Sequence, residues 1–448
     1  MNELYCGAKE LFEGLWIYDQ WDWEANQRPV IWLKFATFQY KDYPLRDAIF
    51  AGLSKEAERL GVTPPDNDMD HPLLDLLKKV NEHYGQKAVL LIDEYDKPII
   101  DFLNDIPRAE ANRDTLKWLY SVLKDSDALL EKIFITGVSA FSKVSIFSDL
   151  NHLTNLTLHR HAYTLLGITQ KELETVFAEQ LAQYDKEQVK RWYNGYGWGG
   201  DERVYNPFSL LSFLNGQEFN NFWFETGTPT FLIKEMIKHR YYAVSGTETT
   251  ERDLLNFDFT RLNPVSVLFQ TGYLTITKYV PEDLLYTLDY PNMEVKHSLE
   301  QLLLREYLDD AFFSPLPRVV KMRNALQAGD VDTPMSILNS LLAEIPGELW
   351  QGQTEHFYHA VVHLSFSLLG TYIRSEARSA RGRCDALVET ADHLYIFEFK
   401  LDQTAQAAMQ QIHDKGYLTP YADSHKKVVA IGANFSSETK QIEEWVVK

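Results

Sequence analysis

The first part of the chain alternates short apolar runs with longer amphipathic stretches. Three runs are apolar enough for strands buried on both faces, and they lie at 30–35, 88–92 and 132–138. The stretches between them have helical spacing and lie at 45–60, 73–85 and 109–130. Buried strands that alternate with helices are typical of a parallel α/β sheet, so the pattern predicts such a sheet within residues 1–165.

The pattern changes near Gly167 and again near Gln351. Residues 166–345 are predicted to be mostly helical, with helices including 170–184, 206–214 and 299–313. The last section, 346–448, is predicted to contain, in order, a long helix, a hairpin-like strand pair, a second helix and a further strand: 355–370, 384–389 with 394–401, 404–417 and 427–433. The sequence therefore predicts a separate α/β domain at the end of the chain.

Composition narrows the class of protein. Of the 448 residues, 45% are hydrophobic, which is ample for packed cores, yet no apolar run reaches the roughly 18–20 residues of a membrane helix. The first residues show no basic segment followed by an apolar one, so they do not resemble a secretory signal. Two distant cysteines, Cys6 and Cys384, suit a reducing compartment. We expect a cytoplasmic protein without membrane spans.

The charge is unevenly distributed. A formal net charge of -20 should repel nucleic acid at long range. Residues 351–448, however, carry 10 Lys+Arg and 12 Asp+Glu, so this section is nearly neutral. Four arginines of this section lie within ten residues: Arg374, Arg378, Arg381 and Arg383. A local basic strip of this kind can bind phosphates, although a solvated loop with scattered charges is the alternative.

The strand at 394–401 carries the strongest chemical signal. Its residues alternate, so Glu398 and Lys400 share one face while Phe397 and Phe399 share the other. Asp385 begins the partner strand and can approach Glu398 if the two strands pair. Two converging carboxylates suit Mg²⁺, and a lysine beside them can stabilise a developing negative charge. The alternative is an edge strand with a Glu–Lys pair on its solvent face.

The order of elements around this strand resembles the PD-(D/E)XK nuclease core. The stretch from about 350 to 448 is similar to the nuclease domain at the end of a family of bacterial AAA-ATPase-like proteins. The resemblance implies a Mg²⁺ (or Mn²⁺) site with Asp385 and Glu398 as ligands, Lys400 as a catalytic residue, and DNA as the substrate. It further implies that Glu355 completes the metal site, that Glu376 lies close to it, and that Gln411 and Tyr417 support it.

The apolar strand at 88–92 ends in a second acidic pair. Acids at the carboxyl end of a parallel strand stand where open α/β sheets bind ligands, and Asp93–Glu94 resembles a Walker B motif. The alternative is that the acids from Asp93 to Asp96 cap the next turn. The wider stretch 88–165 is similar to the same AAA-ATPase-like family, which implies ATP near Asp93 and Glu94, with Thr136 and Ser139 as sensor residues.

One family element has no counterpart in this sequence. No G-x-x-x-x-G-K-[ST] motif occurs, and the first residues resemble the helix that follows this P-loop in the family. We therefore expect an α/β protein with a truncated P-loop NTPase-like parallel sheet, a helical middle region and a C-terminal restriction-endonuclease-like domain. We expect weak or no ATP binding, and Asp93 and Glu94 as remnants of a site.

Two other functions stay open alongside Mg²⁺-dependent DNA cleavage. One is a non-catalytic module that binds nucleic acid or protein, and the other is an ATP-driven regulatory ATPase. The oligomeric state is open as well.

Overall fold

A computed structural model describes most of the chain. It covers residues 1–66, 68–138, 153–223, 230–255, 263–308, 315–345, 347, 350, 354–369, 373–374, 378–379 and 382–448. At 230–231, 354–356, 373–374, 378–379 and 382–383 it describes the backbone alone.

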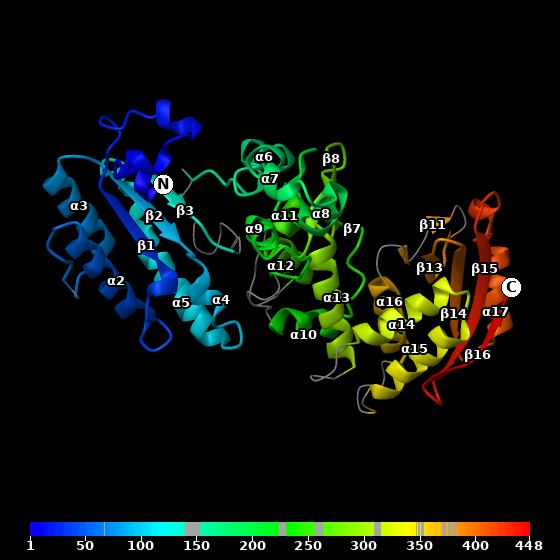
Figure 1. Cartoon of the computed structure of the whole chain (residues 1–448). Helices are drawn as coiled ribbons and strands as arrows, with labels where there is room; N and C mark the ends of the chain where they lie inside the picture. Colours follow the sequence, from blue (N-terminus) through cyan, green and yellow to red (C-terminus); the bar gives the residue numbers. More distant parts are fainter. Residues whose placement is uncertain are drawn as a thin grey trace. The chain divides into compact units, whose positions relative to one another are not determined.

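The chain divides into two compact units. Their helices and strands are labelled in Figure 1. The first unit comprises Met1–His159, Thr249–Gly272 and Pro281–Leu285. The second comprises Arg160–Glu248, Tyr273–Val280 and Tyr286–Lys448.

The first unit is built on a three-stranded parallel sheet in the order β1-β2-β3. The strands are β1 (Val30–Lys34), β2 (Ala88–Asp93) and β3 (Leu130–Ile135). The central strand β2 is buried from Ala88 to Ile92, as a strand covered on both faces must be. The three strands predicted from the apolar runs are thus confirmed, and so is their parallel pairing.

The helices of the first unit are α1 (Asn2–Tyr5), α2 (Leu45–Arg59), α3 (Pro72–Tyr84), α4 (Lys97–Ile100), α5 (Ile106–Tyr120), α11 (Glu251–Leu254) and α12 (Pro264–Gln270). Helix α3 ends as its sequence indicates, because Gly85 adopts a left-handed conformation with φ 64° that other residues rarely adopt. Helix α5 starts earlier than predicted, since the Asp105 side chain accepts a hydrogen bond from the Arg108 backbone.

The second unit contains most of the helices. They are α6 (Gln170–Val176), α7 (Ala178–Leu181), α8 (Lys186–Tyr193), α9 (Pro207–Gly216), α10 (Thr230–Lys238), α13 (Met293–Tyr307), α14 (Leu316–Gln327), α15 (Asp332–Glu344), α16 (Thr354–Leu368) and α17 (Ala405–Asp414). Residues 166–345 also form short strands that the sequence did not predict: β4 (Ile168–Thr169), β5 (Asn194–Tyr196), β6 (Val204–Tyr205), β7 (Thr247–Thr250), β8 (Thr275–Val280) and β9 (Leu285–Asp289). They pair in the orders β4-β6-β5 and β7-β9-β8.

The C-terminal part of the second unit is a five-stranded mixed sheet in the order β10-β13-β14-β15-β16. Its strands are β10 (Ile373–Arg374), β13 (Ala386–Glu389), β14 (His393–Leu401), β15 (Lys427–Ser436) and β16 (Gln441–Val447). Strands β11 (Arg378–Ser379) and β12 (Gly382–Arg383) pair separately. The predicted hairpin is confirmed by antiparallel pairing of β13 with β14, and β14 pairs in parallel with β15. This mixed sheet confirms the predicted fold class.

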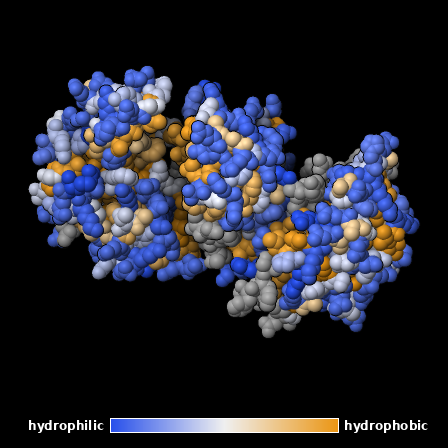
Figure 2. Space-filling model, in the orientation of Figure 1, coloured by the Kyte–Doolittle hydropathy of each residue, from blue (hydrophilic) through white to orange (hydrophobic). Residues whose placement is uncertain are grey.

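Hydrophilic residues dominate the visible surface of both units, with apolar residues scattered among them (Figure 2). In the part of the chain that the structure describes, no helix has both the length and the apolar character needed to cross a membrane.

Candidate active site

Strand β14 separates two chemically different faces. On one face, Phe397 and Phe399 pack against helix α16, with ring centroids 4.7 Å apart for Phe366 and Phe397 and 6.0 Å apart for Tyr358 and Phe399. Glu398 and Lys400 project from the other face, where Gln411 of helix α17 accepts a hydrogen bond from Lys400 and donates one to Glu398. The alternation that the sequence predicted is therefore present in the structure.

Helix α17 lies unusually close to the sheet at Gly432. This residue is paired with Glu398 across β14 and β15. A Cβ atom at Gly432 would lie 2.5 Å from both the Ala405 carbonyl oxygen and the Met409 nitrogen. Only glycine fits under the helix backbone without displacing it, so Gly432 allows Gln411 to approach the strand.

Glu398, Lys400 and Gln411 form a closed hydrogen-bonded triangle. The Lys400 ammonium donates to Glu398 Oε1 at 3.2 Å and to Gln411 Oε1 at 2.6 Å. Gln411 Nε2 donates to the same Glu398 oxygen. The Glu398 side chain is 3% exposed and that of Lys400 is 18% exposed, so the ion pair is shielded from water. Each of the three side chains is fixed by the other two.

Asp385 lies next to this triangle. It immediately precedes β13, and continuation of the β13–β14 register places it opposite Glu398. Its Oδ2 accepts a hydrogen bond of 2.7 Å from the Phe399 backbone nitrogen. Burial and then the Asp385 carboxylate raise the pKa of Glu398 to about 7, while Lys400 acts in the opposite direction. The two predicted carboxylates thus interact electrostatically, as a shared cation site requires.

The donor set fits a hard divalent cation. Glu398 Oε2 is buried and has no hydrogen-bond partner among the described residues, while its other oxygen binds Lys400 and Gln411. A buried carboxylate oxygen without a partner is costly, and a cation shared with Asp385 would compensate for it. Within the described residues, no group of three or more potential metal-binding side chains is present.

Two tyrosines complete the surroundings. Tyr417 is buried and hydrogen-bonds Gln411, and burial raises its pKa. Tyr358, on α16, is fully buried, and its hydroxyl has no partner among the described residues. Burial raises the pKa of Tyr358 well above its ordinary value, and Asp385 and Glu398 add to this effect. The sequence indicated Tyr417 by resemblance but missed Tyr358, whose position three residues after Glu355 was the available signal.

Several predicted residues cannot be placed at this site. Helix α16 begins at Thr354 and so includes Glu355, but the Glu355 side chain lies outside the described part. Glu376 lies wholly outside the described residues. The side chains of the arginine-rich strip, Arg374, Arg378, Arg381 and Arg383, also lie outside them.

The other predicted site, at the end of β2, is simpler. Asp93 Oδ1 accepts a hydrogen bond of 2.6 Å from the Thr136 hydroxyl, so the structure brings these two predicted residues together. Glu94 follows with φ 53°, a left-handed conformation that is uncommon outside glycine, and its Oε2 is buried without a hydrogen-bond partner in the described part of the chain. Ser139 lies outside the described residues.

Comparison with known proteins identifies the class to which both regions belong. Residues 1–147 match the family model of a predicted AAA-ATPase, and residues 353–445 match that of the PD-(D/E)XK nuclease superfamily. The predicted resemblance is therefore confirmed for both domains. 

One curated relative extends over the whole chain. It is an uncharacterized protein in the vnfD 5'region of Azotobacter chroococcum mcd 1, 35% identical over 459 residues, covering 100% of this chain and 88% of the relative. The chain belongs to the same family as this protein, with an AAA-ATPase-like domain and a PD-(D/E)XK nuclease domain. No solved structure matches the chain.

Proposed function

We propose that the C-terminal domain hydrolyses phosphodiester bonds in DNA with the help of Mg²⁺ or Mn²⁺. The observation that carries this proposal is the buried Glu398 carboxylate. One of its oxygens accepts hydrogen bonds from Lys400 and Gln411, and the other has no hydrogen-bond partner among the described residues. The Asp385 carboxylate interacts electrostatically with this group. An apolar strand has no structural need for this arrangement, whereas a metal-dependent hydrolase does.

In this proposal, Asp385 and Glu398 hold the cation. A bound divalent cation would polarise the phosphodiester and lower the pKa of a bound water. The Lys400 ammonium is held beside the carboxylate by Glu398 and Gln411, where it can stabilise negative charge that develops on the phosphoryl oxygens. Gln411 positions Lys400 and Glu398 together. We propose Glu355 as a further contributor, because its helix also carries Tyr358.

The choice of DNA as substrate rests on the nuclease superfamily match and on local charge. Residues 351–448 carry 10 Lys+Arg and 12 Asp+Glu, so this section has little of the net charge of -20 that the whole chain carries. A nearly neutral section, in whose sequence four arginines lie within ten residues, repels phosphates far less than the rest of the chain does.

The decisive experiment compares two lysine variants of the full chain. Purified wild type, Lys400→Ala and Lys415→Ala are incubated with supercoiled plasmid and with single-stranded DNA, in Mg²⁺, in Mn²⁺ and in EDTA. Lys415 is an exposed lysine just after α17, so Lys415→Ala is the matched control. We expect cleavage by wild type and Lys415→Ala with either metal, none in EDTA, and a loss of about 100-fold or more for Lys400→Ala.

Equal cleavage by wild type and Lys400→Ala would contradict the proposal. An absence of cleavage by every variant, together with retained DNA binding, would favour a non-catalytic binding module.

We further propose that these 448 residues bind ATP weakly, because they contain no G-x-x-x-x-G-K-[ST] motif to bind the β- and γ-phosphates. Calorimetric titration with ATP and Mg²⁺ tests this. A dissociation constant in the micromolar range or below would contradict it. Asp93, Glu94, Thr136 and Ser139 are then parts of a site that does not bind nucleotide tightly in this chain.

A further inference from the structure

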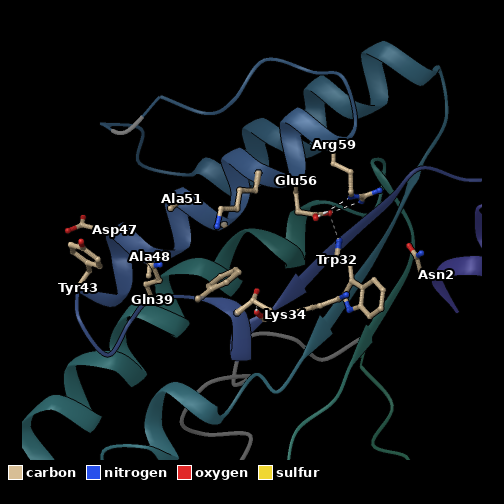
Figure 3. A pocket seen from close by; sticks show the side chains of 14 residues that line it. Asn2, Trp32, Lys34, Gln39, Tyr43, Asp47, Ala48, Ala51, Glu56 and Arg59 are labelled. Carbon is tan, nitrogen blue, oxygen red and sulfur yellow. Dashed lines mark hydrogen bonds and ion pairs between the residues drawn. The ribbon is translucent and has the colours of Figure 1, made fainter.

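The first unit contains a cavity far along the chain from the nuclease domain. Its volume is about 670 Å³, and it lies between helix α2 and strand β1 (Figure 3). We call it the α2–β1 pocket. Its lining includes Trp32 and Lys34 from β1, Gln39 and Tyr43 from the following loop, and Lys55 from α2. A volume in this range accommodates a ligand of nucleotide size.

The strand edge beside the pocket is closed to a pairing peptide. Among the described strands, β1 is the outer strand of its sheet, a position whose outward backbone groups can in general pair with an added strand. The Trp32 nitrogen, however, donates to Glu56 Oε2 at 3.0 Å, and Arg59 donates to the Val30 carbonyl oxygen. Glu56 and Arg59 also pair with each other at 2.7 Å. These side chains take the positions that an added strand would need, which rules out strand addition at this end of β1.

Two lysines give the pocket a positive character. The Lys34 ammonium lies 3.3 Å from the centre of the Trp32 ring, and Figure 3 shows both side chains at the β1 side of the cavity. Lys55 is exposed and forms no ion pair with any described residue. Two carboxylates line the pocket, those of Asp47 and Glu56. Glu56 is paired with Arg59, so within the described residues only the Asp47 carboxylate has no ion-pair partner to offset the two lysines. The local balance therefore favours an anion, in a chain whose overall charge is -20.

Aromatic and amide groups supply the rest of a recognition surface. Tyr43 is 57% exposed and lies at the far end of the pocket from Trp32 (Figure 3). An aromatic ring left in water at the rim of a cavity is a platform on which a flat ligand can stack. Gln39 is exposed and offers both a hydrogen-bond donor and an acceptor. Aromatic rings combined with unpaired lysines are the chemistry by which proteins bind a base together with its phosphate.

We propose that the α2–β1 pocket binds one nucleotide unit, with its base against Tyr43 and its phosphate between Lys34 and Lys55. The same chemistry is offered by a free nucleoside monophosphate and by one nucleotide of a single strand. The proposal does not depend on hydrolysis at the C-terminal site.

The test measures binding by the full chain in EDTA, so that cleavage does not contribute. The probes are a fluorescein-labelled oligothymidylate, followed by anisotropy, and the monophosphates AMP and dTMP, followed by calorimetry. The pocket variants are Lys55→Glu and Tyr43→Ala. Their matched controls are Lys78→Glu, an exposed lysine on α3, and Trp16→Ala, an aromatic residue that is 78% exposed and outside the pocket.

We expect Lys55→Glu and Tyr43→Ala each to weaken binding about tenfold, and the two controls to stay within about twofold of wild type. Tighter binding of the oligonucleotide than of the monophosphates identifies a single strand as the occupant, and the reverse identifies a free nucleotide. Pocket variants that behave like their controls overturn the proposal, as does a failure of all probes to bind below about 1 mM. Melting temperatures equal to wild type show that each variant is folded, and Lys34→Ala provides a second phosphate-side variant.

Discussion

The two strands that carry candidate acidic residues, β2 and β14, differ in what surrounds their carboxylates. Asp93, at the end of β2, shares a hydrogen bond with the neutral Thr136 hydroxyl, and no ion pair joins it to a cation in the described residues. Glu398, in β14, is 3% exposed, binds Lys400, and has its pKa raised to about 7 by burial and Asp385. A strand acid is common to both regions, but among the described residues only the second region combines a charged partner with a buried, unpartnered oxygen on the same carboxylate. The comparison teaches that the environment of an acid, more than its place on a strand, indicates chemistry.

The largest expected effect separates the two regions directly. Asp385→Asn or Glu398→Gln removes a proposed metal ligand, so we expect DNA cleavage to fall by about 100-fold or more. Asp93→Asn should leave cleavage within about twofold of wild type, because Asp93 belongs to the other unit. Initial rates on plasmid DNA measure both, with the exposed Glu438→Gln as a control for loss of charge. Loss of cleavage in Asp93→Asn would show that the two regions act together.

A second change disturbs the helix that supports Glu398. In Gly432→Ala, the new Cβ would lie 2.5 Å from two backbone atoms of α17, so the helix must shift. We expect the free energy of unfolding to fall by about 1–3 kcal/mol and cleavage to fall with it. Chemical denaturation measures the former. Gly347→Ala is the control, since a Cβ there meets no atom of the described residues within 4 Å. Equal stability of the two variants would mean that α17 is not held against the sheet at Gly432.

A smaller effect distinguishes function from stability within the same domain. Tyr358→Phe removes a buried hydroxyl that has no hydrogen-bond partner among the described residues. The free energy of unfolding should therefore change by less than about 1 kcal/mol. Cleavage should nevertheless fall about tenfold, because the Tyr358 hydroxyl interacts electrostatically with Asp385 and Glu398. Tyr395→Phe is the converse control, since Tyr395 donates to the Leu326 carbonyl at 2.6 Å. It should lose stability and keep its activity. Unchanged cleavage in Tyr358→Phe would remove Tyr358 from the site.

The smallest effect concerns a buried acid without a proposed catalytic role. Glu300, on α13, accepts a hydrogen bond of 2.7 Å from Ser367, and burial raises its pKa above the ordinary value of 4.5. Above pH 4.5 the folded state then holds this proton more tightly than the unfolded state, so stability falls as pH rises through the folded pKa. Glu300→Gln should remove this fall, raising the melting temperature by a few degrees at pH 8 and hardly at pH 4. A gain of equal size at both pH values would contradict the raised pKa.

The sequence predicted the strands and helices whose signals are local. The apolar runs became β1, β2 and β3, and the alternating run at 394–401 became β14. Burial explains the pattern best for β2, which is buried from Ala88 to Ile92, whereas β3 exposes Glu131 and Lys132. The sequence missed β16, where Gln441–Val447 includes two adjacent glutamates, since an edge strand exposes much of its surface. It also missed β4, β5 and β6, which have only two or three residues each and show no periodicity.

The candidate site was predictable only in part, for a similar reason. Alternation along one strand placed Glu398 and Lys400 together, the predicted pairing of the next strand brought Asp385 toward Glu398, and the resemblance added Gln411. Tyr358 was not predicted, because an aromatic residue on an amphipathic helix is ordinarily interpreted as part of the hydrophobic core. The close approach at Gly432 depends on two backbones that are distant in sequence, which no local pattern encodes.

The alternation of polar and aromatic residues along β14 helps to specify its register against β13 and β15. A slip of one residue against β13 and β15 would exchange the two faces, sending Glu398 and Lys400 among the rings beneath α16 and moving Phe397 and Phe399 under α17. Two charged side chains would lose their partners and two aromatic rings would lose their packing. Forms in which β14 is shifted by one residue are therefore strongly disfavoured. The side chains proposed for chemistry therefore also help to exclude alignments shifted by one residue, in which Glu398 and Lys400 would leave the face covered by α17.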